Sequence, residues 1–134
     1  MSRILADERG AVSTFLAVIA LALLMAGGLA IDGGRKVNAL REASHIADNA
    51  ARAGAQAVDL DTLRTTGDLQ LLPSEAANRV EAYLAILGYS ATNVIVNGAT
   101  VTVTVDITVD PVLLPTGPMT VSATETAAAI TQEP

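Results

Sequence analysis

The sequence predicts an α+β protein: one long N-terminal helix, transmembrane in its first half and amphipathic in its second, followed by a short helix packed on a small three-stranded antiparallel sheet. Three observations predict this fold. An uncharged apolar run lies near the N-terminus, a helical spacing of small apolar residues continues after it, and valine and threonine alternate in the C-terminal part. We therefore divide the chain into a leader (1–10), a helical rod (11–58), a connection (59–73) and a head (74–134).

The composition of the 134 residues argues against several classes of protein. No cysteine is present, which excludes a disulfide scaffold, a thiolate zinc site and a cysteine nucleophile. The net charge is −6 and every lysine and arginine lies at or before Arg79, so we expect no nucleic-acid partner. Hydrophobic residues make up 51% but aromatic residues only 2%, too few large side chains to enclose a sizeable pocket for a small-molecule substrate.

The apolar run at residues 11–31 reads AVSTFLAVIALALLMAGGLAI and contains no charge. At ~1.5 Å per residue it spans the roughly 30 Å of a bilayer core, so we predict a single-pass membrane helix. A cleaved secretory signal is the alternative, since small residues near Ala30 would suit a signal peptidase, but the run exceeds the usual ~7–15 apolar residues. We expect a cytoplasmic leader and an extracytoplasmic head, because long segments translocate with little regard to charge.

The second half of the rod, residues 35–58, repeats small or apolar residues at alternating spacings of three and four, which makes one face of a helix. Asp48 lies four residues before Arg52 and predicts a surface ion pair. Small residues also recur every fourth position inside the apolar run, a spacing that lets helix backbones approach closely. We expect helix packing through Ala22, Ala26, Ala30, Gly34, Val37, Leu40, Ala47, Ala51 and Gly54.

Glycine pairs at 27–28 and 33–34 flank the predicted membrane exit. Each glycine costs up to ~1 kcal/mol of helix propensity, so we expect a kink or local melting there. The connection at residues 59–73 has no clear period and is expected to lack regular structure. Ser74 then predicts a helix N-cap and Gly88 the end of that helix. Its core-facing stripe consists of Val80, Tyr83, Leu84 and Leu87.

Two alternating runs flank Asn97-Gly98, which predicts a two-residue hairpin turn with positive φ at both residues. This register pairs Val96 with Ala99. It places the valines of the second strand on one face and its threonines on the other face, which is exposed or contacts another subunit. A third run from Met119 predicts another antiparallel strand.

No residues show the spacing of a catalytic or metal site. His45, the single histidine, lies on the charged helix face without a convincing second ligand, so a solvated helix residue is the better interpretation. Two acidic pairs, Asp59 with Asp61 and Asp106 with Asp110, lack the alternating oxygen ligands and the turn glycine of a calcium loop. We therefore predict no enzyme activity, no metal and no cofactor.

A short charged leader, an uncharged helix and an amphipathic extension into a small sheet-bearing head together resemble the type IV pilin plan. More closely, residues 9–55 resemble the N-terminal region of the TadE/TadG-like pseudopilins of the tight-adherence (Flp) pilus system. The most family-like pieces are Arg9-Gly10, the AIDGGR sequence at residues 30–35 and the ADNAARAGA sequence at residues 47–55.

This resemblance implies cleavage by a prepilin peptidase between Gly10 and Ala11, followed by extraction of the helix from membrane lipid into a filament of pilin or pseudopilin subunits. The family pattern has a glutamate shortly after the cut, whereas Ser13-Thr14-Phe15 contains no acid. The resemblance therefore favours a structural minor pseudopilin at the tip or base of a pilus. It implies a single-pass cell-membrane protein with an extracytoplasmic head that reaches the cell surface after assembly.

A different class of function stays open at this point. The chain would instead be a secreted or membrane-tethered binding module, with a cleaved signal or an uncleaved anchor and no filament role. A mature chain beginning near Ile31 would favour this alternative.

Overall fold

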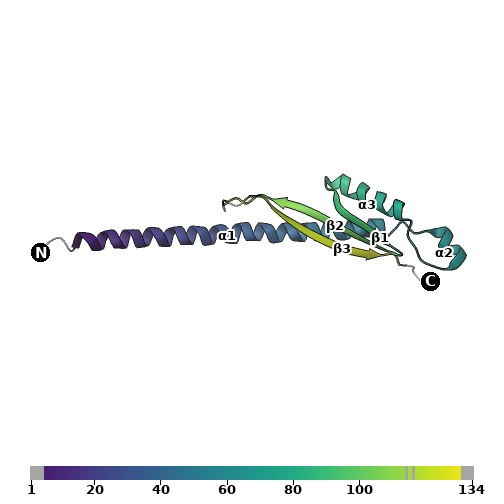
Figure 1. Ribbon diagram of the computed structural model, residues 1–134, viewed down its shortest axis with the longest axis horizontal. Coiled ribbons are helices and arrows are strands. Elements are labelled where there is room, and N and C mark those ends of the chain that lie inside the picture. The colour runs from purple at the N-terminus through teal and green to yellow at the C-terminus, as the bar shows by residue number, and fades with distance from the viewer. Residues whose placement is uncertain (1–4, 114, 116, 131–134) are drawn as a thin grey trace.

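The computed structural model describes residues 5–113, 115 and 117–130 and shows a long helix that projects from a small head (Figure 1). The helix α1 (Leu5–Gly54) has 50 residues and is about 75 Å long at ~1.5 Å per residue. The head also contains α2 (Leu60–Thr66), α3 (Pro73–Leu87), and strands β1 (Ala91–Asn97), β2 (Thr100–Val109) and β3 (Met119–Ala128). This arrangement confirms the predicted α+β class and the pilin-like layout.

The helix α1 continues through both glycine pairs without interruption, so the predicted kink or melting at residues 27–28 and 33–34 is wrong. Glycine lowers helix propensity but keeps its backbone N–H, so the ladder of hydrogen bonds stays complete, unlike at a proline. The helix begins before the expected cleavage point and ends at Gly54, four residues before the predicted end of the rod. Residues 1–4 of the leader lie outside the described residues.

The connection contains a helix that the absence of a period did not predict. The Asp59 side chain caps α2 by accepting hydrogen bonds from the backbone N–H groups of Asp61 and Thr62. Gly67 ends the helix with a φ of 80°. An acidic N-cap and a glycine C-cap define a helix even where seven residues are too few to show a period.

The helix α3 begins two residues earlier than predicted. Leu72 is its N-cap residue and makes no side-chain capping bond, so the prediction of Ser74 as the cap is wrong. Pro73 takes the first helical position instead, where its missing N–H would have had no intrahelical partner. The helix ends at Gly88, with a φ of 77°, as predicted. Val80 and Leu84 of its predicted stripe are fully buried, whereas Leu87 is 45% exposed.

The three strands form an antiparallel sheet in the order β1-β2-β3. The predicted hairpin register is wrong, because the turn lies one residue later than predicted. Asn97 pairs with Thr100 and Val96 pairs with Val101, so the two turn residues are Gly98 and Ala99. Gly98 has a φ of 59°, and no non-glycine residue of the described chain has a positive φ. Asn97 therefore keeps its extended conformation, and the turn uses glycine at its first central position.

The predicted faces of β2 survive this register change, because the partner of Val96 shifts by two residues and the side-chain period is two. Val101, Val103 and Val105 are fully buried. On the outer face the threonines of β2 meet those of β3, and the hydroxyl pairs Thr102/Thr126 and Thr104/Thr124 each share a hydrogen bond, 2.7 and 2.9 Å long.

The core lies between the inner face of the sheet and the C-terminal half of α1, with α3 beside them (Figure 1). The long helix contacts β2, β3 and α3, so it is the central element of the head as well as its extension. Most side chains that α1 contributes are alanines, which allow the sheet to approach the helix backbone closely. Core residues of α1 are Ile46, Ala47, Ala50 and Ala51, and they meet Ala76, Val80, Leu84, Val101, Val103 and Val105.

Candidate functional site

The N-terminal half of α1 presents a large apolar surface. Within the described chain, α1 is the helix long and apolar enough to cross a membrane, with a mean hydropathy of 2.5 and 6% of its most apolar stretch buried. Its large side chains are between 39% and 73% exposed. A continuous apolar surface of this kind requires lipid or other protein around it. The exposed residues include Val12, Phe15, Leu16, Val18, Ile19, Leu21, Leu23, Leu24, Met25, Leu29 and Ile31.

Six of the nine predicted packing residues lie on the exposed part of α1. Ala22, Ala26, Ala30 and Gly34 are spaced four residues apart and are all exposed, so they line one side of the helix. A Cβ placed on Gly34 would meet no atom within 4 Å. Val37 and Leu40 are 48% and 46% exposed. This side of the helix is open to a neighbouring helix over several turns.

The other three predicted packing residues are used inside the protein's own head. Ala47 and Ala51 are fully buried against the sheet and α3. A Cβ placed on Gly54 would lie 2.8 Å from Val80 Cγ2 and 3.2 Å from Val101 Cγ1, so the close approach requires glycine there. The structure thus divides the predicted set into an outward part and an inward part.

Polar contacts hold the sheet and α3 on the long helix. Ser44 Oγ donates a hydrogen bond to Glu125 of β3, and Tyr89 OH donates one to Glu42 Oε1 at 2.8 Å. The hydrogen bond to the Glu42 carboxylate raises the pKa of Tyr89 above its ordinary value, and partial burial adds to this. The predicted Asp48–Arg52 pair is confirmed, with Arg52 Nε 3.1 Å from the carboxylate. The Asp48–Arg52 pair lies within α1, whereas the bonds of Ser44 and Tyr89 join α1 to the rest of the head.

Asp32 joins the long helix to the loop between β2 and β3. Its carboxylate is 1% exposed and accepts hydrogen bonds from the backbone N–H groups of Val112 at 2.9 Å and Leu113 at 3.1 Å. One turn earlier on α1, Gly28 is buried beneath Leu113, whose Cβ would lie 3.2 Å from an added Cβ. The sequence shows an acid directly after the apolar run, but it gives no sign of the partner, which lies about eighty residues away.

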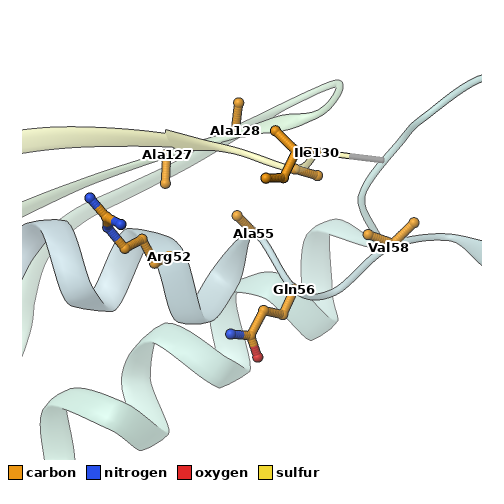
Figure 2. A pocket seen from close by; sticks show the side chains of 8 residues that line it. Arg52, Ala55, Gln56, Val58, Ala127, Ala128 and Ile130 are labelled. Carbon is orange, nitrogen blue, oxygen red and sulfur yellow. The ribbon is translucent and has the colours of Figure 1, made fainter. Parts of the chain in front are cut away.

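A shallow cleft of about 450 Å³ opens between the C-terminal end of α1 and the end of β3 (Figure 2). Ala55 and Gln56 line it from the helix side, and Ala127 and Ile130 from the strand side. Arg52 stands at its edge, where its guanidinium already pairs with Asp48. The cleft contains no acid, histidine or nucleophile among its lining residues, so it offers no catalytic set.

The candidate ionisable residues have structural roles or lie in solvent. His45 is exposed, and no group of three potential metal ligands occurs within residues 5–113, 115 and 117–130. Asp59 caps α2, and the hydroxyl and backbone N–H of Thr62 lower its pKa by stabilising the charged carboxylate. Asp106 accepts a hydrogen bond from Ser122 Oγ on the outer face of the sheet. Gly10 and Ala11, the expected cleavage residues, lie inside α1 and are exposed.

Comparison with known proteins identifies the N-terminal region. Residues 10–57 match the family described as "Putative Flp pilus-assembly TadE/G-like", which confirms the resemblance noted in the sequence. The match covers almost all of α1 and ends just before α2, so the remaining head lies outside it. No curated protein and no solved structure matches the chain. The description of the matched family names pilus assembly, and the match covers residues 10–57 of the 134.

Proposed function

We propose that this chain, whose residues 10–57 carry the TadE/G-like region, is a structural minor pseudopilin of a tight-adherence (Flp) pilus. In this proposal residues 11–31 anchor the protein in the cell membrane, and the head lies on the extracytoplasmic side. The supporting observation is the pairing of an exposed apolar helix with that family match. No enzymatic step is needed for this role.

The exposed half of α1 fits a helix that exchanges lipid for neighbouring helices during assembly. Its large apolar residues suit both surroundings, because lipid tails and packed side chains are equally apolar. One side of α1 carries only small residues at Ala22, Ala26, Ala30 and Gly34, and this allows close approach of a second helix. We expect the other pilin or pseudopilin subunits to pack against this side.

Processing by a prepilin peptidase would occur between Gly10 and Ala11, on the cytoplasmic side. The family match begins at Gly10, and this part of α1 is exposed. After the expected cut, Ser13, Thr14 and Phe15 supply no carboxylate to neutralise the new amino terminus of a neighbouring subunit. Thr14 Oγ1 instead donates a hydrogen bond to the Gly10 carbonyl at 2.9 Å. The missing acid supports a minor subunit, at the tip or base, over a repeating major one.

The intact mass of the native protein tests this proposal. We expect cells that contain the peptidase to yield a chain that begins at Ala11, and a Gly10→Leu variant to keep its leader. A Gly33→Ala variant is the matched control, because a Cβ at Gly33 meets no atom within 4 Å and lies far from the cut. A native mass that retains residues 1–10 would remove the processing step.

The same measurement tests the alternative of a secreted binding module. A chain that begins near Ile31 would have been cut by a signal peptidase, and the membrane anchor would be lost. Such a cut would also remove Gly28 from beneath Leu113, so it would leave that contact of the head incomplete. This structural cost argues for an anchor that is retained.

A further inference from the structure

The described part of the loop between β2 and β3, residues 110–113, 115, 117 and 118, lies beyond the end of β2, alongside α1 on the side of its apolar half (Figure 1). Asp32 holds the loop by accepting hydrogen bonds from the backbone of Val112 and Leu113. Leu113 packs over Gly28, where the absence of a side chain leaves room for it. The loop is therefore fixed against the last turns of the apolar run rather than against the head.

The sequence of the β2–β3 loop is apolar. After Asp110 it reads PVLLPTGP and carries no charge. Val112 is 63% exposed and Leu113 is 55% exposed, although both are large aliphatic residues. They lie beside a helix that exposes Leu29 and Ile31 to a similar degree. Exposed aliphatic side chains are therefore found both on the loop and on the turn of α1 that it contacts.

The position of Gly28 sets the depth of the loop. Gly28 lies three residues before the end of the apolar run at Ile31, which is about 4.5 Å along the helix axis at ~1.5 Å per residue. Elements that lie in a membrane interface bury their apolar side to about 5–10 Å. Leu113 lies over Gly28 at this depth, so the lipid or protein that surrounds α1 there also contacts the exposed part of Leu113.

At five positions of this loop the backbone has no unpaired N–H group. Burying an N–H group in lipid without a hydrogen-bond partner costs on the order of several kcal/mol of free energy. A loop that enters the membrane interface therefore needs paired backbone groups as well as apolar side chains. Pro111, Pro115 and Pro118 have no N–H to satisfy. The N–H groups of Val112 and Leu113 both bond to Asp32.

We propose that the β2–β3 loop inserts into the leaflet of the membrane that faces the head, with lipid acyl chains around Val112 and Leu113. This inference rests on the membrane placement of α1 in the proposed function. The loop gives the subunit a second contact with the bilayer, beside its helix. It fixes the height of the head and the rotation of α1 about its axis before assembly.

Site-specific spin labelling of the full chain tests this inference. The chain has no cysteine, so Val112→Cys, Leu29→Cys and Ile95→Cys each carry one label without background. Leu29 lies in the apolar run and Ile95 on the head, and both are exposed aliphatic residues like Val112. Each protein is reconstituted in phosphatidylcholine vesicles, and the accessibility of the label to oxygen and to a water-soluble nickel complex is measured. Because Val112 is exposed, its label replaces no core contact.

We expect the label at Val112 to match that at Leu29, with high oxygen and low nickel accessibility, and to differ from Ile95. A Val112 label that behaves like Ile95, while Leu29 stays in lipid, overturns the inference and leaves the proposed function intact. A Val112 label shielded from both reagents points to a protein contact and also overturns it. A Leu29 label in water removes the membrane helix itself, and the inference falls with it.

Discussion

The two halves of α1 both carry apolar side chains, but only the C-terminal half buries them within the described chain. In the N-terminal half, leucines, valines and Phe15 stand exposed, whereas in the C-terminal half alanines are fully covered by the sheet and α3. The helix is continuous from one half to the other, so backbone geometry does not distinguish them. The size of the side chains does: small residues allow a sheet to approach, and large residues present area to lipid or to neighbouring helices.

This contrast explains how one helix serves two purposes. A hydrophobic run alone predicts burial without saying what covers it. Ala47 and Ala51 are buried in the core cluster, and Gly54 lies so close to Val80 and Val101 that even a Cβ would not fit there. The side at Ala22 and Ala26 has the same small residues but no covering element within the described chain, so it stays available to a partner.

The largest effect is expected from truncating a large apolar residue of α3 in the core that covers the C-terminal half of α1, compared with one exposed on the N-terminal half. Leu84→Ala removes a fully buried side chain from the core, and we expect the head to lose about 2–5 kcal/mol of unfolding free energy. Leu24→Ala is the matched control, because Leu24 is 73% exposed and should leave the head unchanged. Urea unfolding in detergent micelles, followed by tyrosine fluorescence, reports the head alone, since both tyrosines lie there and the chain has no tryptophan. Equal losses in both variants would break the contrast between the halves.

Enlarging an alanine in each half tests the same contrast from the other direction. Ala47→Leu forces a larger side chain beneath the sheet and should cost about 1–3 kcal/mol by overpacking. Ala22→Leu places the same change on the exposed side and should leave the unfolding midpoint within error. If Ala47→Leu leaves the unfolding midpoint of the head as unchanged as Ala22→Leu does, the fold does not require the sheet to approach α1 closely.

A smaller, local effect is expected where the two halves meet. Asp32→Ala removes the acceptor for the Val112 and Leu113 N–H groups, so these amides should exchange with solvent roughly fivefold faster, which corresponds to about 1 kcal/mol of local opening free energy. Asp32→Asn keeps one carbonyl acceptor and should give an intermediate rate. Hydrogen exchange read by mass spectrometry measures both variants. Unchanged exchange in Asp32→Ala would mean that another interaction holds the loop.

The smallest effect is expected at α2, which lies outside both halves of α1. Hydrogen bonds from Thr62 lower the pKa of Asp59 in the folded chain, so this carboxylate stabilises α2 above the ordinary Asp pKa. That contribution is lost as the pH falls through the lowered pKa, because protonation then removes the charged cap. Amide exchange of α2 should therefore accelerate only below the ordinary Asp range. Asp59→Asn keeps a cap without a titratable group and should flatten this dependence; an unchanged profile would place its cause elsewhere.

Local patterns predicted the elements of this fold better than their long-range partners. Alternation placed Val101, Val103 and Val105 on the core face, and Gly88 marked the end of a helix. The hairpin register failed because Asn97-Gly98 and Gly98-Ala99 are both possible turns, and only the wider packing decides between them. The same limit applies to the function: periodicity identified a packing stripe but did not divide it between partners and head.

The hydrogen bonds from the β2–β3 loop to Asp32 are a second feature that the sequence could not predict. The two segments are about eighty residues apart, and neither carries a motif that refers to the other. An acid after an apolar run reads equally well as the polar end of a membrane helix. Only the folded sheet, which sends its loop back along α1, brings Val112 and Leu113 within reach of the carboxylate.

The most direct test of the account asks which half of α1 meets other pilus subunits. A single cysteine at Ala26, carrying a photoreactive benzophenone, is placed in the full chain in piliated cells, and cross-linked partners are identified by mass spectrometry. A single cysteine at Ala47, where the buried site has no room for that label, is tested instead for reaction with a maleimide. The account predicts cross-links from the exposed Ala26 position to another pilus subunit, and no maleimide reaction at the buried Ala47 position while the head is folded. No subunit cross-link from Ala26, or full maleimide reaction at Ala47, would contradict it.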